Sequence, residues 1–334
     1  MPRKKLAVES PNPVTRDRQA ERQSAKDGLA RRVGNIAAAR RDGTLGEDYI
    51  KLAQAMIMCS LPYSQTDKQR VTRRARLGDG TYLSVTFNAN LPGVPLPFGA
   101  DRKLLAWIFD RAIRSDSPFI PWSSASEYQR EMGFSMSGRS NQQLATRFER
   151  IAGLSIAVQR QAEGKNGIVG YTIIAQANLP SSIGGRIVDA NQKSLPGLED
   201  RFGIRLNADL HADIKRHNVV LPRMLWRQIE GPTQVQDIAF WLVVRCYSAM
   251  SDTVIPWSAL QEQFLNESDT NPRRLKAYAR QAISILRELW PEAMISEVEN
   301  GIAVKRVAQP LLPDDPAKGR IRRLPKVDSY RNPE

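Results

Sequence analysis

The stretch NPRRLKAYARQAISILRELW, residues 271–290, has the pattern of an amphipathic helix. Pro272 suits the first position of a helix, where a missing N–H costs no hydrogen bond. Apolar side chains then recur at the three- and four-residue spacing of one helical face. They are Leu275, Ala279, Ala282, Ile283, Leu286, Leu289 and Trp290. The opposite face consists of Arg273, Ala277, Arg280, Ser284 and Arg287, flanked by Lys276 on one side and by Arg274 and Gln281 on the other. The stretch therefore predicts a helix with one buried and one cationic face.

Such a cationic face has two interpretations. Surface helices often carry arginine only to remain solvated. The alternative is a polyanionic partner, and the composition favours it: the 334-residue chain has a net charge of +14 and a pI of about 10.0. Nucleic acid is the first candidate and a membrane surface the second. No run approaches the roughly 18 apolar residues that span a bilayer, and residues 1–5 precede no apolar signal segment. We expect a soluble protein of a bacterial cytoplasm without a membrane partner.

The chain repeats one order of elements twice. The first unit is predicted as a helix, a short extended element, two helices and two strands, at 101–115, 119–122, 124 to about 133, 139–152, 155–159 and 168–174. The second is predicted at 238–250, 254–258, 258 to about 266, 271–290, 295–298 and 302–307. Both extended elements read Ile-Pro-Trp-Ser, beginning at Ile120 and at Ile255, which are 135 residues apart. This match indicates an internal repeat at the scale of a domain.

The order helix, strand, helix, helix, hairpin is typical of a winged helix, whose third helix can enter a major groove. We therefore predict an α+β, helix-rich fold with two tandem winged-helix domains and flexible basic termini. The expected divisions are a basic, largely disordered tail at 1–45, a first domain for dimerisation and DNA contact at 46–177, a linker at 178–203, a main DNA-binding domain at 204–310 and a basic tail at 311–334. A further helix is expected at 47–59 and a strand at 82–87.

The predicted DNA contacts extend beyond residues 271–290. In the first unit, the polar face of the third helix contributes Arg139, Gln142, Gln143, Thr146 and Arg150, and Lys165 lies at the expected tip of the hairpin. In the second unit, Lys305 and Arg306 lie on the last strand, either as solvated surface residues or as a wing that contacts phosphate. Four tryptophans are expected in the cores: Trp107, Trp122, Trp241 and Trp257.

Catalysis and metal binding find little support in the sequence. Cys59 and Cys246 lie far apart, and the spacing of His211 and His217 suits neither a zinc helix nor a His-hydrophobic-His metal motif. There is no Gly-x4-Gly-Lys-Ser/Thr loop for a nucleotide phosphate. We expect buried, reduced cysteines, no cofactor, no metal and no enzymatic activity, although a strand-nicking replication enzyme is an alternative to be tested.

Four stretches also resemble the RepA-type plasmid replication initiators: Leu61-Pro62-Tyr63, residues 97–107 (PFGADRKLLAW), residues 237–242 (DIAFWL) and residues 289–293 (LWPEA). The resemblance runs from about residue 60 to about residue 312. It is weaker at residues 135–139, where the family often has a turn rich in glycine and lysine.

This resemblance implies a protein that binds short direct repeats, called iterons, in double-stranded plasmid origin DNA. It also implies opening of an adjacent AT-rich segment and recruitment of the host replication initiator and replicative helicase. A monomer-dimer equilibrium, with autorepression of the protein's own promoter by the dimer, would follow as well. The alternative within the same fold is a dimeric transcriptional repressor or partition protein without an initiator role.

Overall fold

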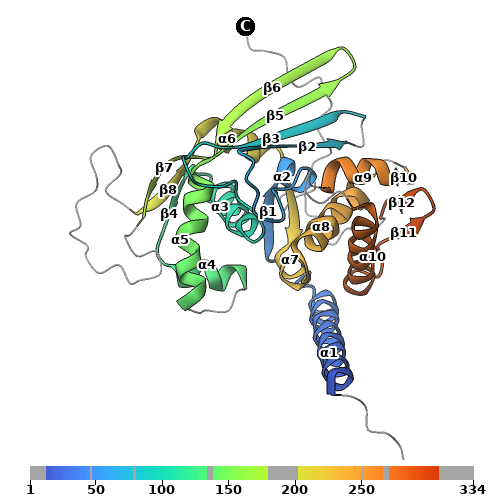
Figure 1. Ribbon diagram of the computed structural model, residues 1–334. Coiled ribbons are helices and arrows are strands. Elements are labelled where there is room, and N and C mark those ends of the chain that lie inside the picture. The colour runs from blue at the N-terminus through green and yellow to red at the C-terminus, as the bar shows by residue number, and fades with distance from the viewer. Residues whose placement is uncertain are drawn as a thin grey trace, which may run out of the picture.

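The computed structural model describes residues 13–45, 47–77, 80–133, 138–179, 202–249, 251–265 and 271–307. Within these ranges the chain has an α+β fold in which helices pack around four small antiparallel sheets (Figure 1). No helix in the described ranges is both long enough and apolar enough to cross a membrane. All four tryptophans predicted for the cores are buried; they are Trp107, Trp122, Trp241 and Trp257.

The C-terminal unit has the predicted order of elements. It consists of α8 (Thr233–Ser248), β10 (Thr253–Pro256), α9 (Trp257–Phe264), α10 (Pro272–Leu289), β11 (Ile295–Val298) and β12 (Gly301–Val304). The strands pair in the order β10-β12-β11, so β10 pairs with the second strand of the β11-β12 hairpin. α10 begins as expected, with the Asn271 side chain accepting a hydrogen bond of 3.0 Å from the Arg273 N–H. Its apolar face is buried against α8.

The N-terminal unit has the same order with an insertion. It consists of α3 (Asp101–Ser115), β4 (Phe119–Pro121), α4 (Ala125–Met132), α5 (Gly138–Ala152), β7 (Ile174–Asn178) and β8 (Gly203–Leu206), and its strands pair in the order β4-β8-β7. Between α5 and β7 the chain inserts β5 (Leu154–Ala162) and β6 (Lys165–Thr172). These join β2 (Arg70–Arg76) and β3 (Tyr82–Ala89) in a four-stranded sheet of order β2-β3-β5-β6.

The two Ile-Pro-Trp elements occupy equivalent places in their sheets. Each Ile-Pro pair lies opposite a Gly-Ile pair: Ile120-Pro121 opposite Gly203-Ile204, and Ile255-Pro256 opposite Gly301-Ile302. The following tryptophan N–H donates a 3.1 Å hydrogen bond to the carbonyl before the glycine, at Phe202 in one unit and Asn300 in the other. The glycines are required by close approach, since a Cβ on Gly301 would overlap the backbone of Ile255. The repeat found in the sequence is therefore a repeat of three-dimensional structure.

The pairing of β7 with β8 corrects the prediction of a linker at residues 178–203. The strands on either side of this segment are neighbours in one sheet, so the segment connects two strands of the N-terminal unit. Its residues 180–201 lie outside the described part of the chain. The composition misled because a loop between two strands and an interdomain linker both favour glycine and proline.

The helix expected at residues 47–59 is also partly wrong. Residues Tyr49–Ala53 form strand β1, and only Gln54–Met58 form a helix, α2. β1 pairs with β9 (Asn218–Pro222), which lies more than 160 residues later and follows α6 (Ala208–Arg216). This long-range partner decides the conformation of β1. α6 packs on α3 and β9 pairs with β1, so the chain continues in the N-terminal unit beyond residue 204.

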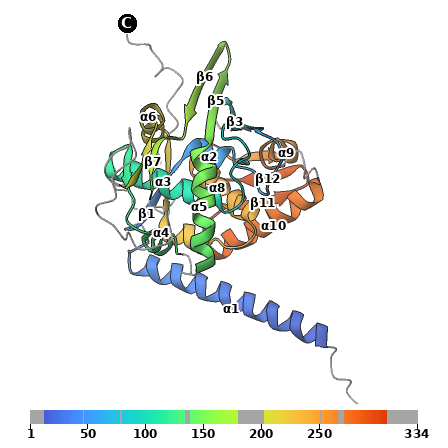
Figure 2. The same ribbon diagram turned by 60° about the vertical axis from the view of Figure 1, so that its left-hand side comes forward.

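The prediction of a largely disordered N-terminal tail does not hold for residues 13–41. They form helix α1 (Pro13–Arg41), whose N-terminal half projects from the rest of the protein (Figure 2). The C-terminal end of the helix is anchored, because Ile36 and Ala39 are buried there. Arg40 also forms a 2.7 Å ion pair with Glu292, after α10. Residues 1–12 and the expected C-terminal tail at 311–334 lie outside the described residues.

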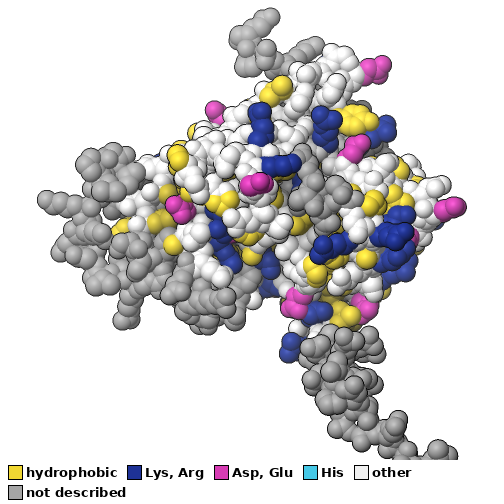
Figure 3. Space-filling model, viewed as in Figure 1, with side chains coloured by type: hydrophobic (Ala, Val, Ile, Leu, Met, Phe, Trp, Pro, Cys, Tyr) yellow, Lys and Arg dark blue, Asp and Glu magenta, His cyan; other side chains and the backbone are white. Residues whose placement is uncertain are grey.

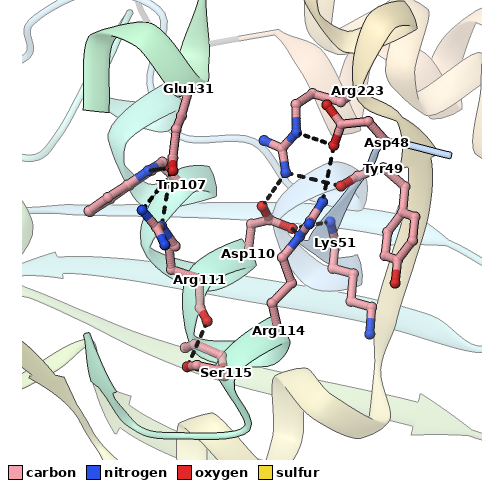
Figure 4. A network of polar contacts seen from close by, with 11 residues as sticks. Asp48, Tyr49, Lys51, Trp107, Asp110, Arg111, Arg114, Ser115, Glu131 and Arg223 are labelled. Atoms are coloured by element: carbon pink, nitrogen blue, oxygen red, sulfur yellow. Dashed lines mark hydrogen bonds and ion pairs between the residues drawn. The ribbon is translucent and has the colours of Figure 1, made fainter. Parts of the chain in front are cut away.

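Buried ion pairs hold the N-terminal unit to the segments that lead into the C-terminal unit. Asp110 of α3, 2 % exposed, accepts hydrogen bonds from the Arg223 guanidinium (2.7 Å), the Arg114 guanidinium (3.1 Å) and the Lys51 backbone N–H (2.7 Å), as Figure 4 shows. Arg223 opens the short helix α7 (Arg223–Gln228). A second ion pair joins Arg102 of α3 to Asp237 of α8, and thereby links two of the stretches that resemble the initiator family. The first contact ties α3 to α7, and the second ties α3 to α8.

Candidate nucleic-acid interface

The outward face of α10 is exposed as the sequence predicted. Arg273, Arg274, Arg280 and Arg287 are exposed together with Ala277, Gln281 and Ser284, whereas Lys276 is half-buried. Figure 3 shows a concentration of Lys and Arg side chains on the side of the molecule where α10 lies. The exposure of this face is confirmed; contact between these residues and DNA stays a prediction.

The second half of this face is held to the hairpin. Arg280 and Glu297 of β11 form two parallel hydrogen bonds, both of 2.7 Å. The hydrogen bond from Arg280 lowers the pKa of Glu297, and the same bond raises the pKa of Arg280. Arg287 donates to the carbonyl oxygen of Ile295 over 2.9 and 3.2 Å. These contacts fix the angle between α10 and β11.

A groove runs between α10 and the hairpin. It is lined by Arg280, Ile283, Ser284, Arg287, Glu288 and Glu297. Its two arginines are matched in number by its two carboxylates. An anion that enters this groove must therefore compete with Glu297 for the Arg280 guanidinium.

The first half of the α10 face has different partners. Arg274 donates a 2.8 Å hydrogen bond to the Tyr278 hydroxyl, and the Lys276 ammonium lies 4.9 Å from the centre of the Trp257 ring. No hydrogen bond or ion pair involves the Arg273 side chain within the ranges the structure describes. Among the contacts of the described residues, Arg273 is thus the α10 cation that needs to break the fewest to bind a phosphate or a base.

The expected wing cations follow the last strand. Lys305 and Arg306 are exposed directly after β12, and Lys305 forms a 3.3 Å ion pair with Asp252. Both partners of this pair are more than half exposed, at 56 % and 66 %. An exposed pair of this kind is weak and screened by salt, so it does not prevent Lys305 from binding a phosphate.

In the N-terminal unit, the structure separates the predicted contacts. Gln143 and Thr146 are exposed on α5, and the side chains of Arg139 and Gln142 lie outside the described part of the chain. Arg150 points inward: it forms a bidentate ion pair of 2.6 and 2.8 Å with Asp101, a carboxylate that is 1 % exposed. This pairing gives Arg150 a structural role, and we leave it out of the interface. No local signal reveals it, because the partner lies 49 residues away.

Lys165 lies at the tip of a hairpin, as expected, but the hairpin belongs to another sheet. It joins β5 to β6 in the four-stranded sheet, whereas the strands equivalent to the C-terminal hairpin are β7 and β8. Strand β2 was not predicted, and it carries exposed arginines at positions 70, 74 and 76. The signal was present, since these three side chains share one parity and therefore one face of a strand.

The two cysteines are free thiols buried in the protein. Burial raises the pKa of both Cys59 and Cys246 to about 12, which keeps the thiols protonated and unreactive near neutral pH. No group of three or more His, Cys, Asp or Glu side chains that could hold a metal occurs among the residues the structure describes.

Comparison with known proteins gives only distant structural likenesses. No protein-family model matches the chain, and no curated protein matches it either. The chain is similar to a crystal structure of RctB domains 2-3 (residues 155–483) with a TM-score of 0.43 and 13 % identity, covering 75 % of this chain and 96 % of that one. A second structure of RctB domains 2 and 3 gives a TM-score of 0.48 and 11 % identity, covering 77 % of this chain and all of that one. Similarity at this level assigns no function of RctB to this chain.

Proposed function

We propose that this protein binds double-stranded DNA sequence-specifically and initiates plasmid replication, without enzymatic activity. The observation that carries the DNA-binding part is the position of α10. It is the third helix of a helix-strand-helix-helix-hairpin unit, and its outward face is exposed and cationic. We take this unit to be a winged helix, in which such a helix lies in the major groove beside a hairpin that contacts the backbone.

Within this proposal the residues of α10 divide into two groups. Arg273 and Lys276 lie near the N-terminal end of the helix, the end that most often reaches base edges or phosphates in helix-turn-helix proteins. Arg280 and Arg287 lie beside the hairpin, where both already form hydrogen bonds with β11. DNA that binds Arg280 competes with Glu297 for its guanidinium. Lys305 and Arg306 contact the backbone from the end of the hairpin.

The initiator role rests on the resemblance of four sequence stretches to the RepA-type family. Two of these stretches contain the partners of the ion pair between Arg102 and Asp237, and this pair supports a fixed relation between α3 and α8. Two DNA-binding units held in one orientation suit neighbouring segments of a repeated site. We further propose that the protein exists as monomers and dimers, that dimers repress its own promoter, and that it contacts the host initiator and the replicative helicase.

Footprinting of the DNA that flanks the gene tests the proposal. The expected result is protection of tandem direct repeats at a spacing of roughly one helical turn or a multiple of it, about 34 Å per turn. A single unrepeated site, or no protection, would contradict it. An origin-cloning assay then separates initiation from repression or partition, because only an initiator supports maintenance of an origin plasmid in trans.

A matched pair of variants locates the interface. Arg273→Ala should weaken binding to the footprinted site by about 1–3 kcal/mol if Arg273 contacts a base. Arg216→Ala removes the same charge from α6, on the other unit, and should leave the affinity within about twofold. Equal losses for both variants would mean that α10 has no special role. A nicking assay on supercoiled plasmid with Mg²⁺ tests the enzyme alternative, and a covalent protein-DNA product would establish it.

A further inference from the structure

The four-stranded sheet β2-β3-β5-β6 presents one face that no other described element covers. Figure 1 shows the helices gathered below this sheet while its other side faces away from the molecule. The covered face buries Leu83, Val85 and Phe87 of β3 together with Ile156 and Val158 of β5. The alternate residues of all four strands therefore form the open face.

The registers place the side chains of the open face in four rows across the sheet. In strand order, the rows are Arg76, Tyr82, Gln161 and Asn166; Arg74, Ser84, Gln159 and Ile168; Thr72, Thr86, Ala157 and Gly170; and Arg70, Asn88, Ser155 and Thr172. All of these residues are exposed or half-buried. None of the sixteen is acidic, so the charge of this face comes from the three arginines of β2. This differs from the groove beside α10, where carboxylates oppose the cations.

Tyr82 lies in the first row, next to Arg76. The Arg76 guanidinium is 5.7 Å from the centre of the Tyr82 ring, and Tyr82 is 48 % exposed. Figure 3 shows Lys and Arg side chains next to hydrophobic ones at the upper right of the molecule, where β2 ends and β3 begins. An exposed ring beside a guanidinium provides a flat surface on which a nucleobase can stack.

The other polar groups of the face suit a strand of bases and phosphates. The amides of Gln161 and Asn166 continue the row of Tyr82, and amides and hydroxyls can donate to or accept from base edges. Arg70, Arg74 and Arg76 follow one strand over six residue steps, which is about 20 Å at roughly 3.4 Å per residue. Three arginines spread over this length of one strand can contact several successive phosphates.

We propose that this open sheet face binds a single strand of nucleic acid, with Arg70, Arg74 and Arg76 on the phosphates and Tyr82 stacked on a base. Sheet faces that combine exposed aromatic and cationic side chains bind unpaired strands, because unpaired bases are free to leave their stack. In a duplex the base faces are stacked on one another and cannot reach Tyr82. The proposal uses no residue of α10 and does not depend on the duplex-binding function.

Fluorescence anisotropy of the full chain with labelled oligonucleotides tests the proposal. The probes are a 20-nucleotide oligo(dT), a 20-nucleotide oligo(U) and a random 20-base-pair duplex. The sheet variants are Tyr82→Ala, its conservative counterpart Tyr82→Phe, and Arg74→Gln/Arg76→Gln. Arg273→Ala/Lys276→Ala in α10 is the matched control. Circular dichroism and thermal unfolding verify that each variant is folded, which we expect because the sheet positions are exposed.

The expected result is binding of at least one single-stranded probe. Tyr82→Ala should weaken this binding by about 5-fold or more, since stacking on one base contributes roughly 1–3 kcal/mol. Tyr82→Phe should stay within about twofold because it keeps the ring. The double arginine variant should reduce the slope of log affinity against log salt by about 0.7 for each lost phosphate contact. Oligo(dT) and oligo(U) separate DNA from RNA as the source of the strand.

Three results would overturn the proposal. The first is no binding of either single-stranded probe, and the second is binding that the sheet variants leave unchanged. The third is an equal loss of duplex binding in the Tyr82→Ala variant, which would make the face a general DNA-contact surface. The α10 control should instead lose duplex affinity and keep affinity for the single strand. If the α10 control kept its duplex affinity while the sheet variants lost single-strand affinity, the result would contradict duplex binding by α10 and support the sheet proposal.

Discussion

The ion pair between Arg280 and Glu297 leads to a prediction about duplex binding. If Arg280 contacts DNA, Glu297 competes with the DNA for the same guanidinium. Neutralising this carboxylate by Glu297→Gln should then strengthen binding to the cognate duplex. If Arg280 serves only to hold the hairpin against α10, the same substitution should weaken binding or leave it unchanged.

The geometry sets the size of the expected gain. The two hydrogen bonds of 2.7 Å are bidentate, but the side chains are 59 % and 33 % exposed. An exposed ion pair is worth at most about a factor of five in an equilibrium constant, and ideal bidentate geometry places this one near the upper end. We therefore expect Glu297→Gln to tighten duplex binding by about 2- to 5-fold at low salt, and by less at high salt.

Glu288→Gln is the matched control for charge. Glu288 lines the same groove, and its substitution removes one negative charge without removing the partner of Arg280. Anisotropy titrations at two salt concentrations should show a larger gain for Glu297→Gln than for Glu288→Gln. The gain should also disappear when Arg280→Ala is combined with Glu297→Gln. Equal gains in both single variants would mean that only net charge matters, and a loss in Glu297→Gln would refute competition for Arg280.

Three further predictions concern the framework that positions these surfaces. Arg150→Ala should destabilise the protein by about 3 kcal/mol in urea unfolding, while duplex affinity of the folded protein stays unchanged. Asp101 is 1 % exposed and loses its bidentate partner, but it keeps the Phe98 N–H at 3.0 Å and Arg147 at 3.7 Å. Arg223→Met should cost about 3 kcal/mol in the same assay, since Asp110 retains two other donors. Gly301→Ala should lower the free energy of unfolding by about 1–3 kcal/mol or more, whereas Gly167→Ala, whose Cβ would meet nothing within 4 Å, should have little effect.

The features that the sequence predicted best depend on local periodicity. The helix predicted at residues 271–290 has an apolar face and a proline at its start. In the structure the helix begins at that proline and buries that face. The repeated Ile-Pro-Trp elements were also reliable. They identified two equivalent strands even though the closing strand of the N-terminal unit arrives only after an inserted hairpin.

The features that the sequence missed depend on partners distant along the chain. β1 is a strand because β9 lies beside it, and residues 178–203 connect two paired strands because β7 and β8 share a sheet. Neither pairing leaves a local signal. The same applies to Arg150, which has the helical position of a solvent-facing cation but meets Asp101 from another helix. A helical wheel gives the direction of a side chain and does not show which acceptor lies nearby.

Each third helix has an arginine that is paired with a carboxylate, Asp101 in the N-terminal unit and Glu297 in the C-terminal unit. The different burial of these two carboxylates explains why the two helices should differ in DNA binding. In α5, Arg150 is bound to the Asp101 carboxylate, whose side chain is 2 % exposed. If Arg150 left, this buried charge would keep the Phe98 N–H and the more distant Arg147 but lose its bidentate partner, at a cost of about 3 kcal/mol. In α10, the acceptor Glu297 is 33 % exposed, so water can replace the arginine when it leaves. Of these two arginines, Arg280 can therefore exchange its internal partner for DNA at small cost. This difference makes α10, and not α5, the helix on which the duplex-binding proposal rests.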